Sequence, residues 1–236
     1  MSRLNWISDE DLENEVARLI EVGRTAIAKK QEEKEFNKNI IDPFSAIYTM
    51  VGFDLSYEEW FISETTRQAQ KTLQNQIGSF HENILSKVEG WEIVGRNAIF
   101  DLYNEERQII AEIKNKHNTV KKSDLVNLHS SLVDLVCNKN SIYRNHTAYY
   151  VVILPQKGQR HNEMFVTSNN ETGRSTTSNE LVRYIDGASF YELVTGEENA
   201  IFDLYNAVID VIKGYDYDVD ELSHVEQYLN KALNKK

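Results

Sequence analysis

Cysteine and proline are scarce in this chain of 236 residues. It has one cysteine, Cys137, and two prolines, Pro43 and Pro155. A single cysteine cannot form an internal disulfide, which fits a reducing cytoplasm, and we expect Cys137 to be a buried thiol on a helix. No low-complexity linker separates domains. The length therefore fits one domain, or one domain with a helical extension.

Long apolar stretches and an excess of positive charge are also missing. No apolar run approaches the length of a membrane span, and the acidic start MSRLNWISDEDLENE lacks the apolar stretch of a signal peptide. The net charge of −11 argues against a general nucleic-acid binder. From Arg107 to Lys122, however, five basic residues and His117 stand against one acid, Glu112. The sequence is thus compatible with a basic cleft on an acidic body.

The octamer NAIFDLYN occurs twice, at Asn97–Asn104 and at Asn199–Asn206, between flanks that share nothing. No longer period appears, so the chain is not a repeat protein. Around the second copy, apolar residues three and four apart predict a helix from Glu197 to Lys213, closed by Gly214. The first copy is short and has turn-like flanks, which predicts a hairpin. Asp203 in the helical copy has no charged neighbour four residues away, and we assign it no catalytic role.

The predicted hairpin pairs Ala98–Tyr103 with Gln108–Lys114 around a turn between Glu105 and Glu106. Side chains alternate between the faces of a strand. Asn104 would then face Arg107, and Asp101 would be a diagonal neighbour of Glu112, roughly 7 Å away between Cα atoms. Lys114 shares their face. The opposite face is purely apolar and consists of Ala98, Phe100, Leu102, Ile109, Ala111 and Ile113.

Two carboxylates and an ammonium on one patch are suited to phosphodiester hydrolysis. Mg²⁺ prefers oxygen ligands, often one or two carboxylates with water and phosphate oxygens. Such a cation polarises a phosphate, and a lysine offsets the charge that grows on it. The alternative is a solvated hairpin face with a Glu–Lys pair, because short patterns such as Glu-x-Lys arise by chance and this chain has another at Glu32–Lys34.

Asp101, ten intervening residues and Glu112-Ile113-Lys114 resemble the PD-(D/E)XK nuclease signature. The strings IGSFHENIL, AEIKNKHNTVKKSD and YIDGASFYELVTG, in this order, resemble a branch of type II restriction endonucleases that cut GGNCC or related palindromes. The resemblance covers roughly residues 77–196. It implies that Asp101 and Glu112 bind the metal and that Lys114 is the catalytic lysine. Glu82 lies in the preceding helix. It either matches an additional acidic metal ligand found in some relatives or is an exposed helix residue. Phe100 stands where the signature has proline.

The predicted fold is α/β (α+β), with a mixed central sheet of about four to five strands flanked by helices, as in restriction endonucleases. We expect one nuclease domain with a helical extension (1–75), a catalytic core (76–213) and a C-terminal helix (214–236). The first expected helix runs from Asp9 to Lys34 with Ser8 as its cap, and a second begins at Pro43. A third begins at Ser56 or Thr65 and ends near Gly90. Two more are expected, one through SDLVNLHSSLVDLVCN with Ser123 as its cap and one from Asp220 to Asn234. Strands beside the hairpin are expected at Trp91–Val94, AYYVVILP and MFVTS.

Two polar loops, QKGQRHNE and SNNETGRSTTSNE, carry side chains that can read base edges. Arginine pairs with guanine O6 and N7, so Arg160 and Arg174 are the first candidates, unless these are simply mobile surface loops. Phosphate contacts position a protein without reading sequence. We expect DNA contacts of this kind in the segment after Lys114, at Lys116, His117, Asn118, Lys121 and Lys122.

The leading hypothesis is a cytoplasmic, Mg²⁺-dependent endonuclease that acts as a homodimer on a short palindrome in double-stranded DNA. It would leave 5′-phosphate ends and would have no membrane partner. A cognate DNA methyltransferase would act on the same DNA site, as a functional and not a physical partner. One alternative is a structure-specific repair nuclease with the same metal site. Another is a non-catalytic, acidic helical interaction module in which the hairpin is only structural.

Overall fold

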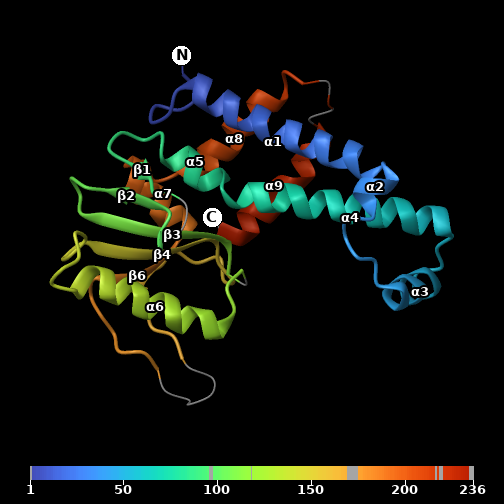
Figure 1. Cartoon of the computed structure of the whole chain (residues 1–236). Coiled ribbons are helices and arrows are strands. Elements are labelled where there is room, and N and C mark those ends of the chain that lie inside the picture. Colours follow the sequence, from blue (N-terminus) through green and yellow to red (C-terminus); the bar gives the residue numbers. More distant parts are fainter. Residues whose placement is uncertain are drawn as a thin grey trace. The chain divides into compact units, whose positions relative to one another are not determined.

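A computed structural model describes residues 2–95, 98–117, 119–168, 175–215, 217 and 220–233 (Figure 1). The chain divides into two compact units: Met1–Glu13 with His81–Lys236, and Asn14–Phe80. We call them the sheet unit and the helical unit. In the described part of the chain, no helix is both long and apolar enough to cross a membrane.

The sheet unit contains a six-stranded mixed sheet in the order β1-β2-β3-β4-β6-β5. Its centre is parallel, with β3 beside β4 and β4 beside β6, and its edges are antiparallel. This confirms the predicted fold class, with six strands where four to five were expected. The strands are β1 (Glu92–Ile93), β2 (Leu102–Asn104), β3 (Ile109–Lys116), β4 (Thr147–Leu154), β5 (Asn162–Met164) and β6 (Val182–Asp186).

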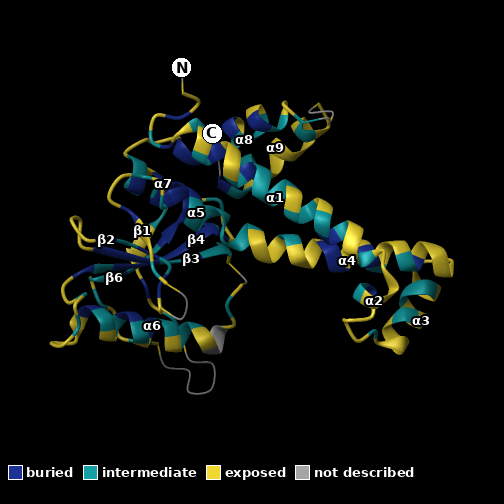
Figure 2. Ribbon diagram, turned by 45° about the horizontal axis from the view of Figure 1, so that its top comes forward, coloured by how far each residue is buried: buried dark blue, intermediate teal, exposed yellow. Residues whose placement is uncertain are grey.

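Helices cover both faces of the central strands, which explains why AYYVVILP is a continuous apolar run (Figures 1 and 2). On one face α6 (Lys122–Cys137) buries Leu132 and Val136 completely. On the other lie α7 (Gly187–Thr195) and α8 (Ala200–Ile212). The first residue of α7 almost touches β4: a Cβ on Gly187 would be 2.4 Å from the carbonyl oxygen of Ile153, so only glycine fits there.

The N-terminal residues and two further helices complete the sheet unit. The ring of Trp6 packs edge-on against Tyr191 of α7, with 6.2 Å between centroids. Helix α5 (Phe80–Leu85) begins at the boundary of the unit and buries Ile84 and Leu85. Helix α9 (Asp220–Leu233) follows α8 in the chain. The end of α9 that was expected at Asn234 lies outside the described residues.

The helical unit contains two helices with well-formed N-terminal caps. It contains α2 (Glu33–Phe36), α3 (Pro43–Gly52), α4 (Tyr57–Gly78) and most of α1 (Asp9–Lys30). The carboxylate of Asp42 accepts from the backbone N–H groups of Phe44 and Ser45, with Pro43 at the first helical position, as predicted. Ser56 starts α4 with a complete capping box. The predicted helix from Asp9 to Lys34 ends early, at Lys30, and α2 follows it.

Several predictions from the sequence were wrong in detail. The helix expected from Ser56 or Thr65 to near Gly90 starts after Ser56 and is divided at Ser79 into α4 and α5. Lys121, not Ser123, is the N-cap residue of α6. The strand expected at MFVTS lies earlier, at β5, while β6 and α7 were not foreseen.

Cys137 was expected to be buried, and the structure shows that it is exposed. It directly follows Val136, which is completely buried. Consecutive side chains on a helix are separated by about 100° around its axis. Cys137 therefore projects to the side of the buried stripe rather than along it.

Candidate active site

The hairpin of β2 and β3 forms with a different register from the one predicted. Asn104 is opposite Ile109 instead of Arg107, and the loop runs from Glu105 to Gln108. The amide oxygen of Asn104 accepts from the backbone N–H of Arg107 at 2.8 Å, and Gln108 has a φ of 52°. The shift is two residues. Because the side-chain period of a strand is also two, residues within the two strands keep their predicted faces.

The strand itself begins only at Leu102, so the alternation predicted for Ala98–Phe100 fails. Phe100 was expected on the face of Leu102. It packs instead against Tyr143, with 4.9 Å between ring centroids, in the same buried cluster as Ile110. Asp101 continues the ladder through its backbone bond to Ala111, but residues 98–100 lie outside the strand, so alternation no longer decides where their side chains point.

Asp101 is fixed directly to β3. Its backbone N–H donates to the carbonyl oxygen of Ala111 at 2.9 Å, and its Oδ2 accepts from the backbone N–H of Ile113 at 2.7 Å. Extending the observed register by one residue places Asp101 opposite Glu112 rather than diagonal to it. The two carboxylates are therefore closer neighbours along the strands than the sequence predicted.

Lys114 completes a cluster with these two acids. Its Nζ lies 2.5 Å from Oε1 of Glu112 and 3.9 Å from Oδ2 of Asp101. The three side chains are only partly open to solvent, with 26% of Lys114, 13% of Glu112 and 24% of Asp101 exposed. The cluster is accessible to a small ligand and is sufficiently buried for its charges to interact strongly.

Glu82 of α5 lies within electrostatic range of this cluster. Burial, followed by the charge of Asp101, raises the pKa of Glu82 to about 7 against the opposing effect of Lys114. The side chain is partly buried, so the interpretation as an exposed helix glutamate is wrong. Among the residues that the structure describes, no group of three or more His, Cys, Asp or Glu side chains is arranged to hold a metal.

The cluster has a shortage of positive charge. Burial raises the pKa of Glu112 to about 7, and the repulsion from Asp101 acts in the same direction, against Lys114. Burial alone would lower the pKa of Lys114, but the charges of Glu112 and Asp101 outweigh it and the pKa is raised. A carboxylate pair of this kind is stabilised by a cation. Its oxygen donors are those that Mg²⁺ prefers.

Tyr150 of β4 is a neighbour of the cluster that the sequence analysis did not single out. It pairs with Glu112 in the parallel register of β3 and β4. Burial, and to a smaller extent the charges of Tyr184 and Glu112, raise the pKa of Tyr150 to about 12. Its ring also packs against Phe165, with 4.8 Å between centroids. Tyr150 thus gives Glu112 a neutral aromatic neighbour. The sequence did not reveal it, because β3 and β4 are paired only in the folded structure.

Comparison with known proteins shows the family. The model of the Eco47II restriction endonuclease family matches residues 4–215. The chain belongs to this family. It is 48% identical over 215 residues to the type II restriction enzyme Eco47II of Escherichia coli, covering 90% of this chain and 88% of that one. It is 34% identical over 214 residues to the type II restriction enzyme Sau96I of Staphylococcus aureus, covering 87% and 78% respectively.

Membership of the Eco47II family confirms the resemblance found in the sequence and the enzyme class, a type II site-specific deoxyribonuclease. The hypothesis of a non-catalytic helical module is thereby set aside. The matched residues include Glu82, Asp101, Glu112 and Lys114, together with the helical unit. Helix α9 lies beyond the match.

In this Eco47II family member, the predicted phosphate contacts follow the cluster directly. Lys116 and His117 are exposed at the end of β3. The hydroxyl of Thr119 donates to the carbonyl oxygen of Lys116, which closes a tight turn. Lys121 is exposed before α6, and Lys122 is the first residue of that helix. Asn118 lies outside the described residues.

The two arginines predicted to read bases differ in their setting. Arg160 is paired with the protein itself: its guanidinium donates to the carboxylate of Glu192 at 2.5 Å and to the carbonyl oxygen of Glu198 at 2.6 Å. Reading a base would require it to leave both partners. Arg174 lies outside the described residues.

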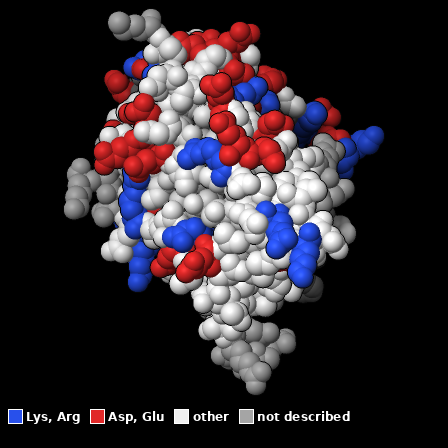
Figure 3. Space-filling model, turned by 90° about the vertical axis from the view of Figure 1, so that its left-hand side faces the viewer, with Lys and Arg blue, Asp and Glu red and all other residues white. Residues whose placement is uncertain are grey.

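Charge is unevenly distributed on the face shown in Figure 3. Most Asp and Glu side chains in that view lie in its upper half, with some Lys and Arg among them, whereas the lower half shows small groups of Lys and Arg on largely uncharged surface beside one acidic group. A negative net charge is thus compatible with local basic groups on one face.

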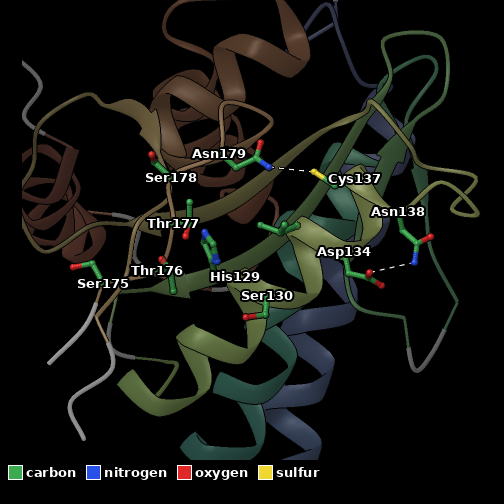
Figure 4. A pocket seen from close by; sticks show the side chains of 11 residues that line it. His129, Ser130, Asp134, Cys137, Asn138, Ser175, Thr176, Thr177, Ser178 and Asn179 are labelled. Carbon is green, nitrogen blue, oxygen red and sulfur yellow. Dashed lines mark hydrogen bonds between the residues drawn. The ribbon is translucent and has the colours of Figure 1, made fainter. Parts of the chain in front are cut away.

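A separate hollow of about 670 Å³ lies between α6 and residues 175–179 (Figure 4). His129 and Cys137 line it from the helix, and the amide of Asn179 donates to Sγ of Cys137 at 3.1 Å. None of Asp101, Glu112 and Lys114 lines this hollow. It is therefore distinct from the acidic cluster.

Proposed function

We propose that this Eco47II family member hydrolyses phosphodiester bonds at a short, GGNCC-like palindrome in double-stranded DNA and requires Mg²⁺. The observation that carries the proposal is the cluster of Asp101, Glu112 and Lys114, which converges on one face of the sheet in a chain of this family. The hydrolysis adds water to phosphorus and breaks the bond to the 3′ oxygen. The products are a 3′-hydroxyl and a 5′-phosphate.

Asp101 and Glu112 would hold the Mg²⁺, with Glu82 as a further candidate from α5. The donor set fits because it offers carboxylate oxygens, and the pKa values of Glu82 and Glu112 are raised first by burial and then by the charge of Asp101. When bound, the cation polarises the phosphate and lowers the pKa of a bound water. The bond from the N–H of Ile113 to Oδ2 fixes the carboxylate of Asp101 in one orientation.

Lys114 would act on the phosphate during the reaction. Its ammonium is held at the cluster by Glu112, and its raised pKa keeps it charged at neutral pH. A fixed positive charge stabilises the oxygens on which negative charge develops in the transition state. Lys114 can also donate a hydrogen bond to the attacking water and so orient it toward phosphorus.

The segment that follows Lys114 would hold the DNA backbone. Lys116, Lys121 and Lys122 supply positive charges for phosphates, with His117 and Asn118 as further contacts. Arg160 and Arg174 are the proposed base readers, and Arg160 would have to exchange both Glu192 and the carbonyl oxygen of Glu198 for a guanine. Two copies of the chain would act as a homodimer whose two-fold symmetry matches the palindrome. A cognate DNA methyltransferase would protect the same site.

The test is digestion of a sequenced plasmid with the pure protein and Mg²⁺, followed by mapping of every cut end. One repeated palindromic sequence at all ends, with 5′-phosphates, is the expected result. Cuts at unrelated sequences that share a distorted DNA structure would instead indicate a repair nuclease. If the wild-type protein cuts no DNA with Mg²⁺, the proposal fails, and Asp101→Asn serves as the control for contaminating nuclease.

A further inference from the structure

Helix α3 carries an apolar stripe that faces solvent. Phe44, Ile47, Tyr48 and Val51 are 72%, 57%, 77% and 78% exposed. Their spacing of three and four residues places them on one side of the helix. The less exposed side of α3 consists of Ala46, Thr49 and Met50, and no residue of α3 is fully buried (Figure 2).

This arrangement reverses the usual orientation of a surface helix. Amphipathic helices normally turn their large apolar side chains toward the core and their polar ones toward water. Here two aromatic and two branched side chains point outward. The adjoining Phe53 and Tyr57 are also 73% and 60% exposed. We call these six residues the α3 surface: Phe44, Ile47, Tyr48, Val51, Phe53 and Tyr57.

The size of the α3 surface matches one side of a stable protein interface. An aromatic side chain can bury about 150–250 Å², so the four partly covered aromatic rings together with Ile47 and Val51 present on the order of 800 Å². The largest apolar patch on a typical monomer covers about 300–600 Å². A standard interface buries about 800 Å² on each partner.

Charge identifies which partner fits. The chain has a net charge of −11, so two copies repel each other over most of their surface. Residues 43–53 contain no charged side chain, and Asp42 and Asp54 stand at either end. A two-fold interface joins one patch to its own copy. An apolar, uncharged patch satisfies that condition, whereas an acidic patch does not.

We propose that the α3 surface is where two copies of this chain associate. The inference deepens the homodimer of the proposed function by assigning its contact to α3. The occupant is a second copy, because the two-fold pairing covers both apolar patches at once and residues 43–53 bring no charged side chain into the contact.

The test measures the mass of the full-length protein by light scattering at about 10 µM without DNA. The wild type should have twice the 27.4 kDa of one chain. The variant Ile47→Lys/Val51→Lys would place four lysines in a two-fold interface. Because juxtaposed like charges cost several kcal/mol, its dissociation constant should rise at least ~100-fold, so on dilution its mass should fall to that of one chain at concentrations where the wild type is still a dimer. The matched control is Ile142→Lys, at an isoleucine of the sheet unit that is 81% exposed, and it should remain a dimer.

Circular dichroism should show the same helix content in all three proteins, since every substituted side chain is exposed. A monomeric wild type would assign the α3 surface to another partner and overturn the proposal. A lysine variant that remains dimeric would overturn it as well. Cleavage of plasmid by the wild type with Mg²⁺ is measured in parallel. A monomer that cuts DNA would contradict only the α3 interface, and a dimer that cuts no DNA would contradict only the proposed nuclease activity.

Discussion

Replacing Glu112 by glutamine should stabilise the metal-free protein at alkaline pH, although it removes the ion pair with Lys114. Burial and Asp101 raise the pKa of Glu112 from its ordinary 4.5 to about 7, so together they outweigh the lysine. The folded protein therefore holds this proton more tightly than the unfolded chain does. This contribution to stability is complete below pH 4.5 and is lost as the pH rises through 7.

The magnitude follows from the two pKa values. At pH 8 the ionised Glu112 costs the folded state roughly 3 kcal/mol relative to a neutral side chain. The side chain is only 13% exposed, so solvent screens little of this. At pH 5 the cost falls below about 1 kcal/mol, because the folded state keeps the proton. For a chain of this size, the gain at pH 8 corresponds to an increase in Tm of about 5–10 °C.

The assay is thermal unfolding of wild type and Glu112→Gln with EDTA at pH 5 and pH 8, with the exposed Glu106→Gln as control. The expected pattern is a clear rise in Tm for Glu112→Gln at pH 8, a much smaller rise at pH 5, and no change for the control. A lower Tm at pH 8 would mean that the ion pair with Lys114 dominates. The cluster would then be a structural salt bridge, and the electrostatic argument for a cation site would be refuted.

The remaining predictions concern cleavage and DNA binding. Asp101→Asn should abolish cleavage and Asp203→Asn should retain most of it, because Asp101 lies beside Glu112 and Lys114 whereas Asp203 belongs to α8 and lines a different hollow. Equal loss in two folded variants would contradict this. Lys114→Ala should cut about 10²-fold to 10³-fold more slowly in single-turnover assays yet bind its site in Ca²⁺ nearly normally, since its charge acts mainly in the transition state; near-normal cutting would exclude it as the catalytic lysine. Lys121→Ala should weaken binding equally on all DNA and reduce the salt slope by about one, and a changed site preference would count against a phosphate contact.

The hairpin shows how far periodicity reaches. Alternation placed Asp101, Glu112 and Lys114 on one face, and this placement survived a wrong register because the error was two residues. An error of one residue would have separated them. The same alternation failed at Phe100, where the backbone is no longer a strand and the ring packs against Tyr143. Local rules therefore apply only where the regular element exists.

The two copies of NAIFDLYN make the same point about propensity. One copy enters β2 at Leu102, and the other lies in α8 from Ala200 onward. Identical residues adopt different structures because their flanks impose different apolar periods, and burial outweighs intrinsic preference. The flanking sequence was sufficient to predict this difference. It was not sufficient to place the first residue of the strand.

By itself, the sequence determined the elements whose signals are local. These are the start of α3 at Pro43, the buried strand β4, and the shared face of Glu112 and Lys114, all of which depend on neighbours a few residues apart. Only the tertiary structure decided that Glu82 approaches the cluster, that Trp6 packs against Tyr191, and that the stripe of α3 faces solvent. Each of these depends on which distant segments pack together, and side-chain periodicity shows that a face is apolar without showing what covers it.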